Sequence, residues 1–182
     1  LLFVGRISPE KGVHVLLDAF QKVLEYYPKA HLDIVGSYWQ LPYEFIITLS
    51  ENIKVSKLTS FYDGIVTKFN LSYFNHLQKK ILLLGIEKNV TFTGHIPHMN
   101  VVGYYSNATV YVNPSFSEAF PMPIPEAMAS ELPVIATNVG GTSEAIVDGQ
   151  TGILVKAGDV RMLSEAMIHL LSNDDLRRSM GK

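Results

Sequence analysis

The stretch SEAFPMPIPEAMAS, residues 117–130, holds two glutamates, Glu118 and Glu126, with seven residues between them, three of which are prolines. A carboxylate accepts two hydrogen bonds side by side, so this spacing suits a loop that holds the vicinal hydroxyls of a sugar and of a ribose. Two other interpretations stay open. Glu126 can stabilise the positive end of a helix while Glu118 is merely exposed, or the two can form a glycosidase-like acid/base pair.

Two cations follow the first apolar run of the chain. Arg6 comes directly after Gly5, and Lys11 precedes Gly12 where a helix is expected to begin. Two cations at a strand-to-helix junction can clamp a diphosphate, and the nearby helix N-terminus adds partial positive charge. The alternative is a pair of solvated surface charges.

The other polar motifs give weaker indications. Gly140–Gly141 lies between an expected strand and an expected helix, which suits either close approach to a ligand or a tight turn. Glu144 fits a first helical turn. His95 and His98 lie in a loop with Pro97, and the six histidines show no metal-ligand spacing, so we expect no metal site. The sequence has no P-loop and no G-x-G-x-x-G, which argues against an ATPase or a dinucleotide enzyme.

Short apolar runs alternate with amphipathic segments along most of the chain. We expect strands at 1–4, 31–36, 90–94, 108–115, 133–137 and 152–157. We expect helices at 13–27, 72–85, 101–106, 124–131, 142–147 and 159–172, with a final turn or two in 174–180. Ser8 and Asp159 are expected to cap helices, and Gly85 to end one.

This alternation predicts the fold class: a doubly wound, Rossmann-like α/β domain with a six-stranded parallel sheet and helices on both faces. Ligands of such folds bind beyond the carboxyl ends of the strands. Four groups of interest fall at these ends: 5–6, 36–37, 94–95 and 114–126. We therefore expect them to converge on one pocket.

Residues 38–70 interrupt the alternation and are rich in aromatic residues. We interpret them as an insertion made of a helix and a hairpin, with Asp63–Gly64 as the turn between the arms LTSFY and IVTKF. The aromatic residues at its start are expected to pack the insertion onto the domain.

Composition excludes several classes of protein. The 182 residues suit one domain, 47% are hydrophobic, and the net charge of −2 does not favour a nucleic-acid partner. There is no cysteine and no apolar run long enough to span a membrane, so we expect neither disulfides nor an integral membrane segment. The chain starts without methionine and inside an apparent strand, and we expect a piece of a longer, cytoplasmic protein.

Taken in order, several stretches of the chain resemble the second, donor-binding domain of GT-B glycosyltransferases of family 4, the glycosyl transferases group 1 family. These stretches are FVGRISPEKGVHVLLDAF, LDIVG, VTFTGHIP, VYVNPSFSEAFPMPIPEAMAS and LPVIATNVGGTSEAIVDGQTGILV. The resemblance covers residues 1–37 and 71–182, and each piece alone is weak whereas the combination is specific.

The resemblance implies a retaining, metal-independent transferase that takes a hexose from a nucleoside-diphosphate sugar, UDP- or GDP-linked, without a cofactor. By resemblance, Arg6 and Lys11 neutralise the diphosphate, Glu118 faces the sugar hydroxyls and Glu126 holds the ribose hydroxyls. Glu118, Arg6 and Lys11 are the implied catalytic residues. The implied donor-binding residues are Gly5, Arg6, Lys11, Gly36, Gly94, His95, Ile96, Glu118, Ala119, Phe120, Pro121, Met122 and Glu126.

The chain departs from the family at two points. The family usually has glycine where Pro121 stands, and Pro121, Pro123 and Pro125 donate no N–H, which leaves those of Phe120, Met122 and Ile124 for a ligand. The 38–70 segment is also longer than the usual connection.

The acceptor would bind to an N-terminal domain outside this chain, so we expect the chain alone to bind donor weakly and to transfer nothing. Peripheral membrane contact stays open for a longer protein. The alternatives are a non-catalytic nucleotide-sugar binding module and an NDP-sugar epimerase of the same fold.

Overall fold

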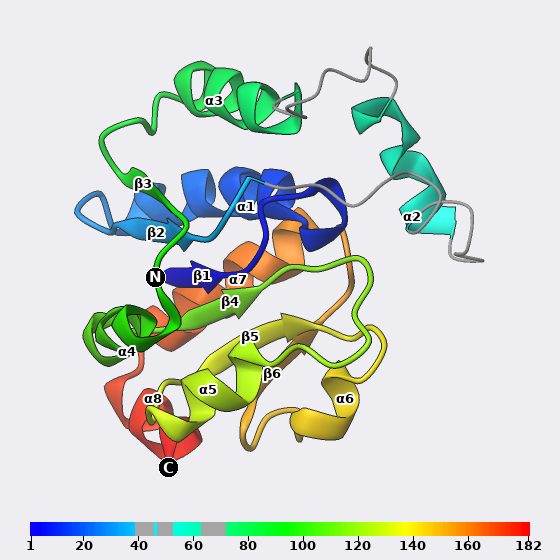
Figure 1. Cartoon of the computed structure of the whole chain (residues 1–182). Coiled ribbons are helices and arrows are strands. Elements are labelled where there is room, and N and C mark those ends of the chain that lie inside the picture. The colour runs from blue at the N-terminus through cyan, green and yellow to red at the C-terminus, as the bar shows by residue number, and fades with distance from the viewer. Residues whose placement is uncertain (39–45, 47–52, 63–71) are drawn as a thin grey trace.

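The computed structural model describes residues 1–38, 46, 53–62 and 72–182. It contains a six-stranded, fully parallel sheet in the order β3-β2-β1-β4-β5-β6, so the predicted fold is confirmed (Figure 1). The strands are β1 (Leu2–Val4), β2 (Leu32–Val35), β3 (Val90–Gly94), β4 (Tyr111–Asn113), β5 (Val134–Thr137) and β6 (Gly152–Val155). Strand β4 is shorter at both ends than the expected strand at 108–115.

The helices alternate with these strands. They are α1 (Val13–Tyr26), α2 (Ile53–Ser56), α3 (Ser72–Leu84), α4 (His98–Asn107), α5 (Pro123–Ala129), α6 (Thr142–Ala145), α7 (Val160–Leu171) and α8 (Asp174–Gly181). The described residues also form two short 3-10 helices, η1 (Pro9–Lys11) and η3 (Lys57–Phe61). The strand order reverses between β1 and β4, and in such sheets the crevice beyond that point is where ligands bind.

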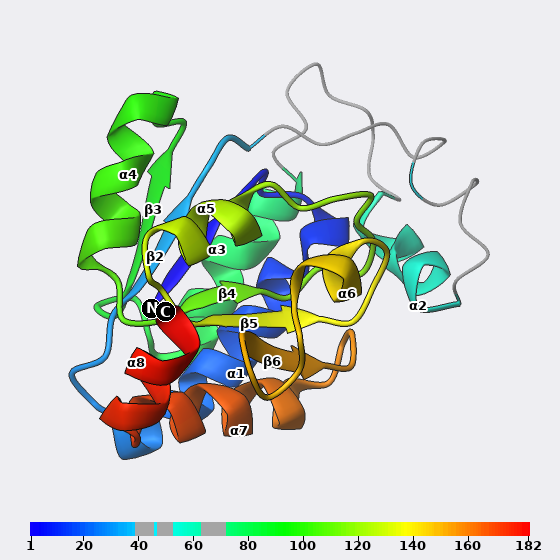
Figure 2. The same cartoon turned by 90° about the horizontal axis from the view of Figure 1, so that it is seen from below.

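Apolar residues on both faces of the sheet build two cores, as a parallel sheet covered on both sides requires. One core joins the sheet to α1, α3 and α7, and the other joins it to α4 and α5. Figure 2 shows α4, α5 and α6 on one side of the sheet and α1 and α7 on the other. The sheet is therefore rigidly held, and its carboxyl edge offers a fixed frame for loops.

Local sequence explains several helix ends. The Asp159 carboxylate accepts the N–H of Met162 at 2.9 Å and caps α7, as predicted. Gly85 adopts the left-handed conformation that follows α3, also as predicted. Ser8, in contrast, is not a side-chain cap, because its hydroxyl donates to the buried Glu10 carboxylate at 2.6 Å.

The part of the insertion that the structure describes contradicts one prediction. Residues 58–62, expected as a hairpin arm, belong to η3 and its end. Val55 and Leu58, three residues apart, are both buried against the core, which is the spacing of one helix face. We had interpreted this stretch as a strand, and so missed the helix. The Asp63–Gly64 turn and the helix expected before residue 50 lie outside the described residues.

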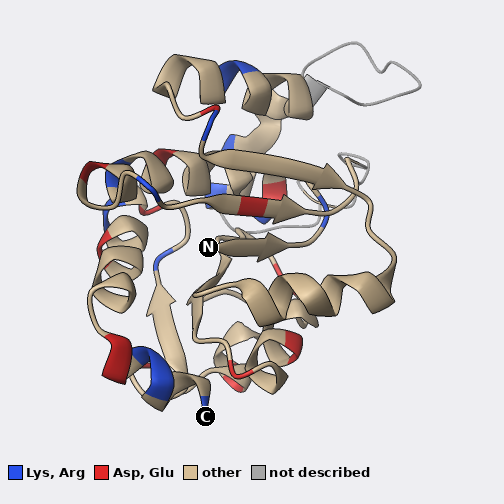
Figure 3. Ribbon diagram, turned by 90° about the vertical axis from the view of Figure 1, so that its left-hand side faces the viewer, with Lys and Arg blue, Asp and Glu red and all other residues tan. Residues whose placement is uncertain are grey.

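Charged residues of both signs are interspersed along the outer helices and loops, while the strands carry few (Figure 3). Within 1–38, 53–62 and 72–182, none of the helices combines the length and the apolar composition needed to cross a bilayer.

His14, at the start of α1, is held in its neutral form by packing. Its ring stacks on Phe116 with centroids 5.6 Å apart and lies 4.8 Å from Phe61. The Tyr73 hydroxyl accepts the backbone N–H of His14 at 3.2 Å and lies 2.8 Å from Nδ1, to which it can donate only while that nitrogen is unprotonated. Burial, and then the charges of Lys80 and His76, lower the pKa of His14 to about 3.

This packing makes the stability of the fold depend on pH. His14 in the unfolded chain titrates near pH 6.5, so between pH 6.5 and about 3 the unfolded state binds a proton that the folded state does not. Stability should therefore fall with pH across this window, by up to about 1.4 kcal/mol per pH unit. We expect the wild-type advantage over His14→Gln to shrink by about 2 kcal/mol between pH 7 and pH 5 in urea denaturation.

The exposed His169 on α7 offers the matched control, since His169→Gln makes the same change of residue type away from the packed rings around His14. A free-energy difference between wild type and His14→Gln that is the same at pH 5 and pH 7 would contradict the assignment.

Candidate active site

The segment after β1 folds around a buried carboxylate, that of Glu10. Glu10 is 1% exposed; its carboxylate lies 3.5 Å from the Arg6 guanidinium and accepts hydrogen bonds from Ser8 at 2.6 Å and from the Tyr62 hydroxyl at 3.3 Å. A buried charge is tolerated only with such partners. Glu10 thus fixes Arg6 at the end of β1, and sequence reasoning missed this role because two of its partners, Ser8 and Tyr62, were expected elsewhere.

The loop after β4 presents Glu118 in a fixed orientation. One carboxylate oxygen, Oε1, lies 2.7 Å from the Ser115 hydroxyl and 3.4 Å from Asn113 Nδ2. The other, Oε2, accepts from Lys11 Nζ at 2.8 Å. The two charged side chains are only 7% and 17% exposed, so this ion pair is shielded from water and its attraction is stronger than at the surface.

Two glycines hold the Glu118 loop by close backbone approach. A Cβ on Gly12 would lie 2.1 Å from the Pro114 carbonyl oxygen, and one on Gly140 would lie 1.7 Å from the Glu118 carbonyl oxygen. Both glycines have positive φ, of 70° and 52°. The neighbouring Gly141 donates its N–H to the Ala119 carbonyl at 3.0 Å. The pair Gly140–Gly141 therefore holds the Glu118 loop in place. The sequence had suggested either close approach to a ligand or a tight turn, and neither interpretation included this role.

The strand ends and the Glu118 loop enclose a cavity of about 230 Å³, which we call the Lys11–Glu118 cavity. Seven of the predicted donor-binding residues line it: Gly5, Arg6, Lys11, Glu118, Phe120, Pro121 and Met122. Asn113 also lines it, and it orients Glu118 although sequence analysis gave it no role. Two cations and a carboxylate thus meet at the switch point of the sheet, as predicted.

Glu126 does not line this cavity, so the expectation that both glutamates converge on one pocket is wrong in this structure. Its carboxylate accepts from the Tyr105 hydroxyl at 2.9 Å and lies 4.0 Å from His98 Nε2, in a separate cavity of about 210 Å³. Burial and the Glu126 carboxylate raise the pKa of Tyr105, which keeps this hydroxyl a donor. The reason is that Glu126 lies on α5, where its side chain contacts Tyr105 on α4 instead of the residues that follow β1.

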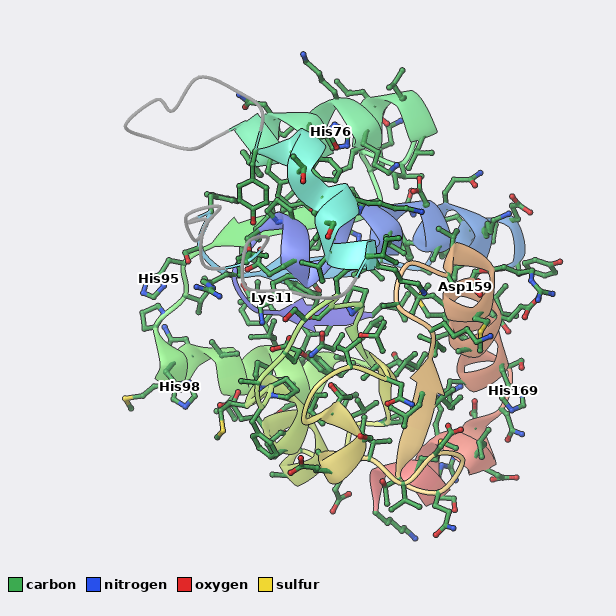
Figure 4. All side chains as sticks on the ribbon, turned by 90° about the vertical axis from the view of Figure 1, so that its right-hand side faces the viewer. Lys11, His76, His95, His98, Asp159 and His169 are labelled. Carbon is green, nitrogen blue, oxygen red and sulfur yellow. The ribbon has the colours of Figure 1, made fainter. Side chains whose placement is uncertain are left out.

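The remaining predicted donor-binding residues lie around the strand ends rather than in the Lys11–Glu118 cavity. Gly36 donates its N–H to the Gly94 carbonyl at 3.0 Å, and a Cβ on Gly36 would lie 1.8 Å from the Gly5 carbonyl oxygen. Ile96 packs against the core shared with α4. His95 is exposed at the edge of the molecule, as Figure 4 shows, and Ala119 contributes its carbonyl to the Gly141 contact.

The prolines change what the start of α5 can donate. Pro123 and Pro125 occupy its first turn, where a missing N–H leaves no helical bond unmade. The Ile124 N–H donates to the Pro121 carbonyl at 2.9 Å, so it is not the ligand donor that the sequence indicated. Of the three N–H groups expected to remain for a ligand, those of Phe120 and Met122 are left.

The six parallel strands with helices on both faces form a Rossmann-like fold of the kind found in the C-terminal domains of GT-B glycosyltransferases. The family model for glycosyl transferases group 1 matches residues 1–182, and the chain belongs to this family.

Individual relatives agree with this assignment. The D-inositol 3-phosphate glycosyltransferase of Corynebacterium diphtheriae is 32% identical over 183 residues, which cover 100% of this chain and 36% of that protein. The chain thus spans about a third of the length of this curated relative. The expected glycosyl transferases group 1 family is therefore confirmed.

Solved structures share the fold. The C-terminal domain of LpcC, a glycosyl transferase group 1 family protein from Francisella tularensis, is 25% identical with a TM-score of 0.77, over 100% of this chain and 79% of that one. Anabaena HepE, solved in complex with UDP-glucose, is 22% identical with a TM-score of 0.76, over 99% of this chain and 41% of HepE.

The glycine contact with the Glu118 loop can be tested by a matched pair of substitutions. Gly140→Ala must move the loop or the turn, because its Cβ overlaps the Glu118 carbonyl, and we expect a loss of about 2–3 kcal/mol. Gly149→Ala has a similar positive φ of 75° but meets nothing within 4 Å, so it should cost only about 1 kcal/mol. Thermal or urea denaturation of both variants measures the difference, and equal losses would mean that the contact is unimportant.

Proposed function

We propose that this chain is the donor-binding part of a glycosyltransferase that takes a hexose from a nucleoside-diphosphate sugar. The observation that carries the proposal is the meeting of Arg6, Lys11 and Glu118 in one shielded cavity at the switch point. Two cations match the two negative charges of a diphosphate, and a carboxylate matches sugar hydroxyls. Membership of a family of glycosyltransferases supports the same reaction class.

The size of the cavity suggests how a donor divides between sites. About 230 Å³ is below the usual range for a whole ligand, so we assign this cavity to the sugar and the diphosphate. We assign the ribose to Glu126, in the separate cavity between α4 and α5, and the base to residues 94–97. HepE, which has the same fold, binds UDP-glucose, so a UDP-sugar is the first donor to test and a GDP-sugar the second.

The existing ion pair shapes the proposed chemistry. Lys11 and Glu118 hold each other at 2.8 Å, so a donor must replace both partners, with phosphate on Lys11 and hydroxyls on Glu118. Arg6 stays anchored by Glu10 and faces the same cavity. We propose that these two cations stabilise the departing diphosphate without a divalent metal, and that transfer proceeds with retention, as the family resemblance implies. EDTA should then leave donor binding unchanged.

The start of α5 has few free backbone N–H groups. This favours a second candidate function, a nucleotide-sugar binding module without catalysis. The Ile124 N–H is already used within the chain, so fewer backbone groups remain to stabilise charge that develops during transfer. A transferase should lose turnover well beyond its loss of donor affinity when Glu118 is replaced by alanine in the longer protein, whereas a binding module has no turnover to lose. The acceptor is proposed to bind outside this chain.

Donor binding provides the direct test of the proposed site. Lys11→Gln removes the cation nearest Glu118, and we expect the Kd for the preferred NDP-sugar to rise about 10- to 100-fold, because charge-assisted bonds are worth about 1.5–3 kcal/mol. A thermal-shift series with UDP-, GDP- and ADP-sugars selects the donor, and calorimetry then measures the Kd.

The control is Lys29→Gln, which removes an exposed lysine beyond the end of α1 and should leave the Kd unchanged. The proposed function fails if no NDP-sugar shifts the melting temperature, or if both lysine variants bind the donor like the wild type.

A further inference from the structure

A second and larger cavity lies where the insertion meets the domain. Its volume is about 620 Å³, within the range of small-molecule sites, and it shares no lining residue with the Lys11–Glu118 cavity. The walls come from α1, from α2 and η3, from Phe116, and from the segment 156–160 between β6 and α7. Figure 4 shows α2 lying over α1, with Asp159 beside them at the start of α7. We call this the lysine cavity.

The lysine cavity carries three cations, Lys54, Lys57 and Lys156. Lys54 donates to the Ala157 carbonyl at 2.7 Å, which ties the insertion to the segment before α7. Among the residues that the structure describes, neither Lys57 nor Lys156 takes part in an ion pair. Two ammonium groups from separate segments are therefore available at the same opening.

The two acids of the lysine cavity are already engaged. Asp18 pairs with Lys80 at 2.6 Å, and Asp159 caps α7 through the Met162 N–H. Their charges are thus partly compensated by groups that do not line the cavity. The remaining balance of charge favours an anion, and a phosphate is the anion that two lysines commonly bind.

The inner wall of the lysine cavity is apolar and aromatic. Leu58 and Phe116 are buried, Phe61 lies edge-on to Tyr73 at 5.2 Å, and the neutral His14 ring fills the space between the two phenylalanines. Phe116 and Leu58 have almost no exposed surface, so of the two phenylalanines the partly exposed Phe61 is the one whose ring can pack against the C–H face of a sugar. The volume also leaves room for a hexose-sized body beside the phosphate.

We propose that the lysine cavity binds a phosphorylated sugar, with the phosphate between Lys57 and Lys156 and the sugar against Phe61. We infer this class of ligand from the residues that line the lysine cavity, and none of them lines the proposed donor site. It is nevertheless linked to that site through Phe116, whose N–H donates to the Glu10 carbonyl at 2.7 Å and which lies two residues before Glu118.

Calorimetry with glucose 6-phosphate, glucose and inorganic phosphate tests the proposal on the 182-residue chain. Glucose 6-phosphate should bind more tightly than phosphate, and glucose should show no binding. Lys57→Gln and Lys156→Gln should each raise the Kd for glucose 6-phosphate about tenfold, the double variant more, and Lys57→Arg should restore much of the loss. Both lysines are exposed, so circular dichroism should report unchanged folding.

Lys11→Gln is the decisive control, because the donor site also attracts phosphates. The proposal is overturned if Lys11→Gln abolishes glucose 6-phosphate binding while the Lys57 and Lys156 variants bind normally, or if glucose 6-phosphate does not bind at millimolar concentration. Failure of NDP-sugar binding alone would leave this result untouched, so the two proposals are tested separately.

Adding the preferred NDP-sugar to the longer protein tests how the bound sugar phosphate acts. Because the acceptor is proposed to bind outside this chain, we expect glucose 6-phosphate to change the Kd for the donor, and we expect Lys57→Gln/Lys156→Gln to abolish this change. A product that carries one hexosyl unit (the hexose less one water) on the sugar phosphate, with the nucleoside diphosphate released, and that forms undiminished in the double variant would contradict the proposal, because the sugar phosphate would then bind at the acceptor site instead.

Discussion

The ion pair between Lys11 and Glu118 is the interaction on which the site depends. It joins segments 107 residues apart in sequence, one leaving β1 and the other leaving β4, across the point where the strand order reverses. A shielded charge that lost its partner would be costly, so each side chain holds the other in place until a ligand offers equivalent contacts to both. A ligand that supplies only an anion replaces Glu118 as the partner of Lys11 and leaves the Glu118 carboxylate unpaired. A ligand that supplies only hydroxyls leaves Lys11 unpaired, and either case carries the cost of a shielded, unpaired charge.

Backbone contacts keep this ion pair at one geometry. Gly12 lies against the Pro114 carbonyl, Gly140 against the Glu118 carbonyl, and the Phe116 N–H donates to the Glu10 carbonyl at 2.7 Å. Glu10 then connects two regions, since its side chain contacts Arg6 in the Lys11–Glu118 cavity and the Tyr62 hydroxyl in the described part of the insertion. The insertion is therefore joined to the site through one buried carboxylate, which gives a physical route by which a ligand in the lysine cavity can affect donor binding.

The sequence was sufficient for features that depend on periodicity and on the geometry common to all parallel sheets. Arg6, Lys11 and Glu118 follow strands that end at one edge, so their convergence could be predicted without knowing any side-chain contact. The position of Glu126 could not, because it depends on how α5 turns toward Tyr105 on α4. Glu10 was missed for the same reason: its burial depends on a tyrosine 52 residues away in the sequence.

The prolines that first distinguished the Glu118 loop also account for the character of the site. With Pro123 and Pro125 in the first turn of α5 and the Ile124 N–H bonded to Pro121, the start of this helix offers little to an anion. Neutralising a diphosphate then falls to the side chains of Arg6 and Lys11. A side-chain cation, unlike the N–H groups of a helix end, can form an ion pair with a carboxylate when no ligand is bound. Here Arg6 pairs with Glu10, and Lys11 pairs with Glu118. The site therefore relies on side-chain cations in place of fixed backbone N–H groups. Lys11 becomes available to a diphosphate only when the Glu118 carboxylate gains another partner, such as the hydroxyls of a sugar.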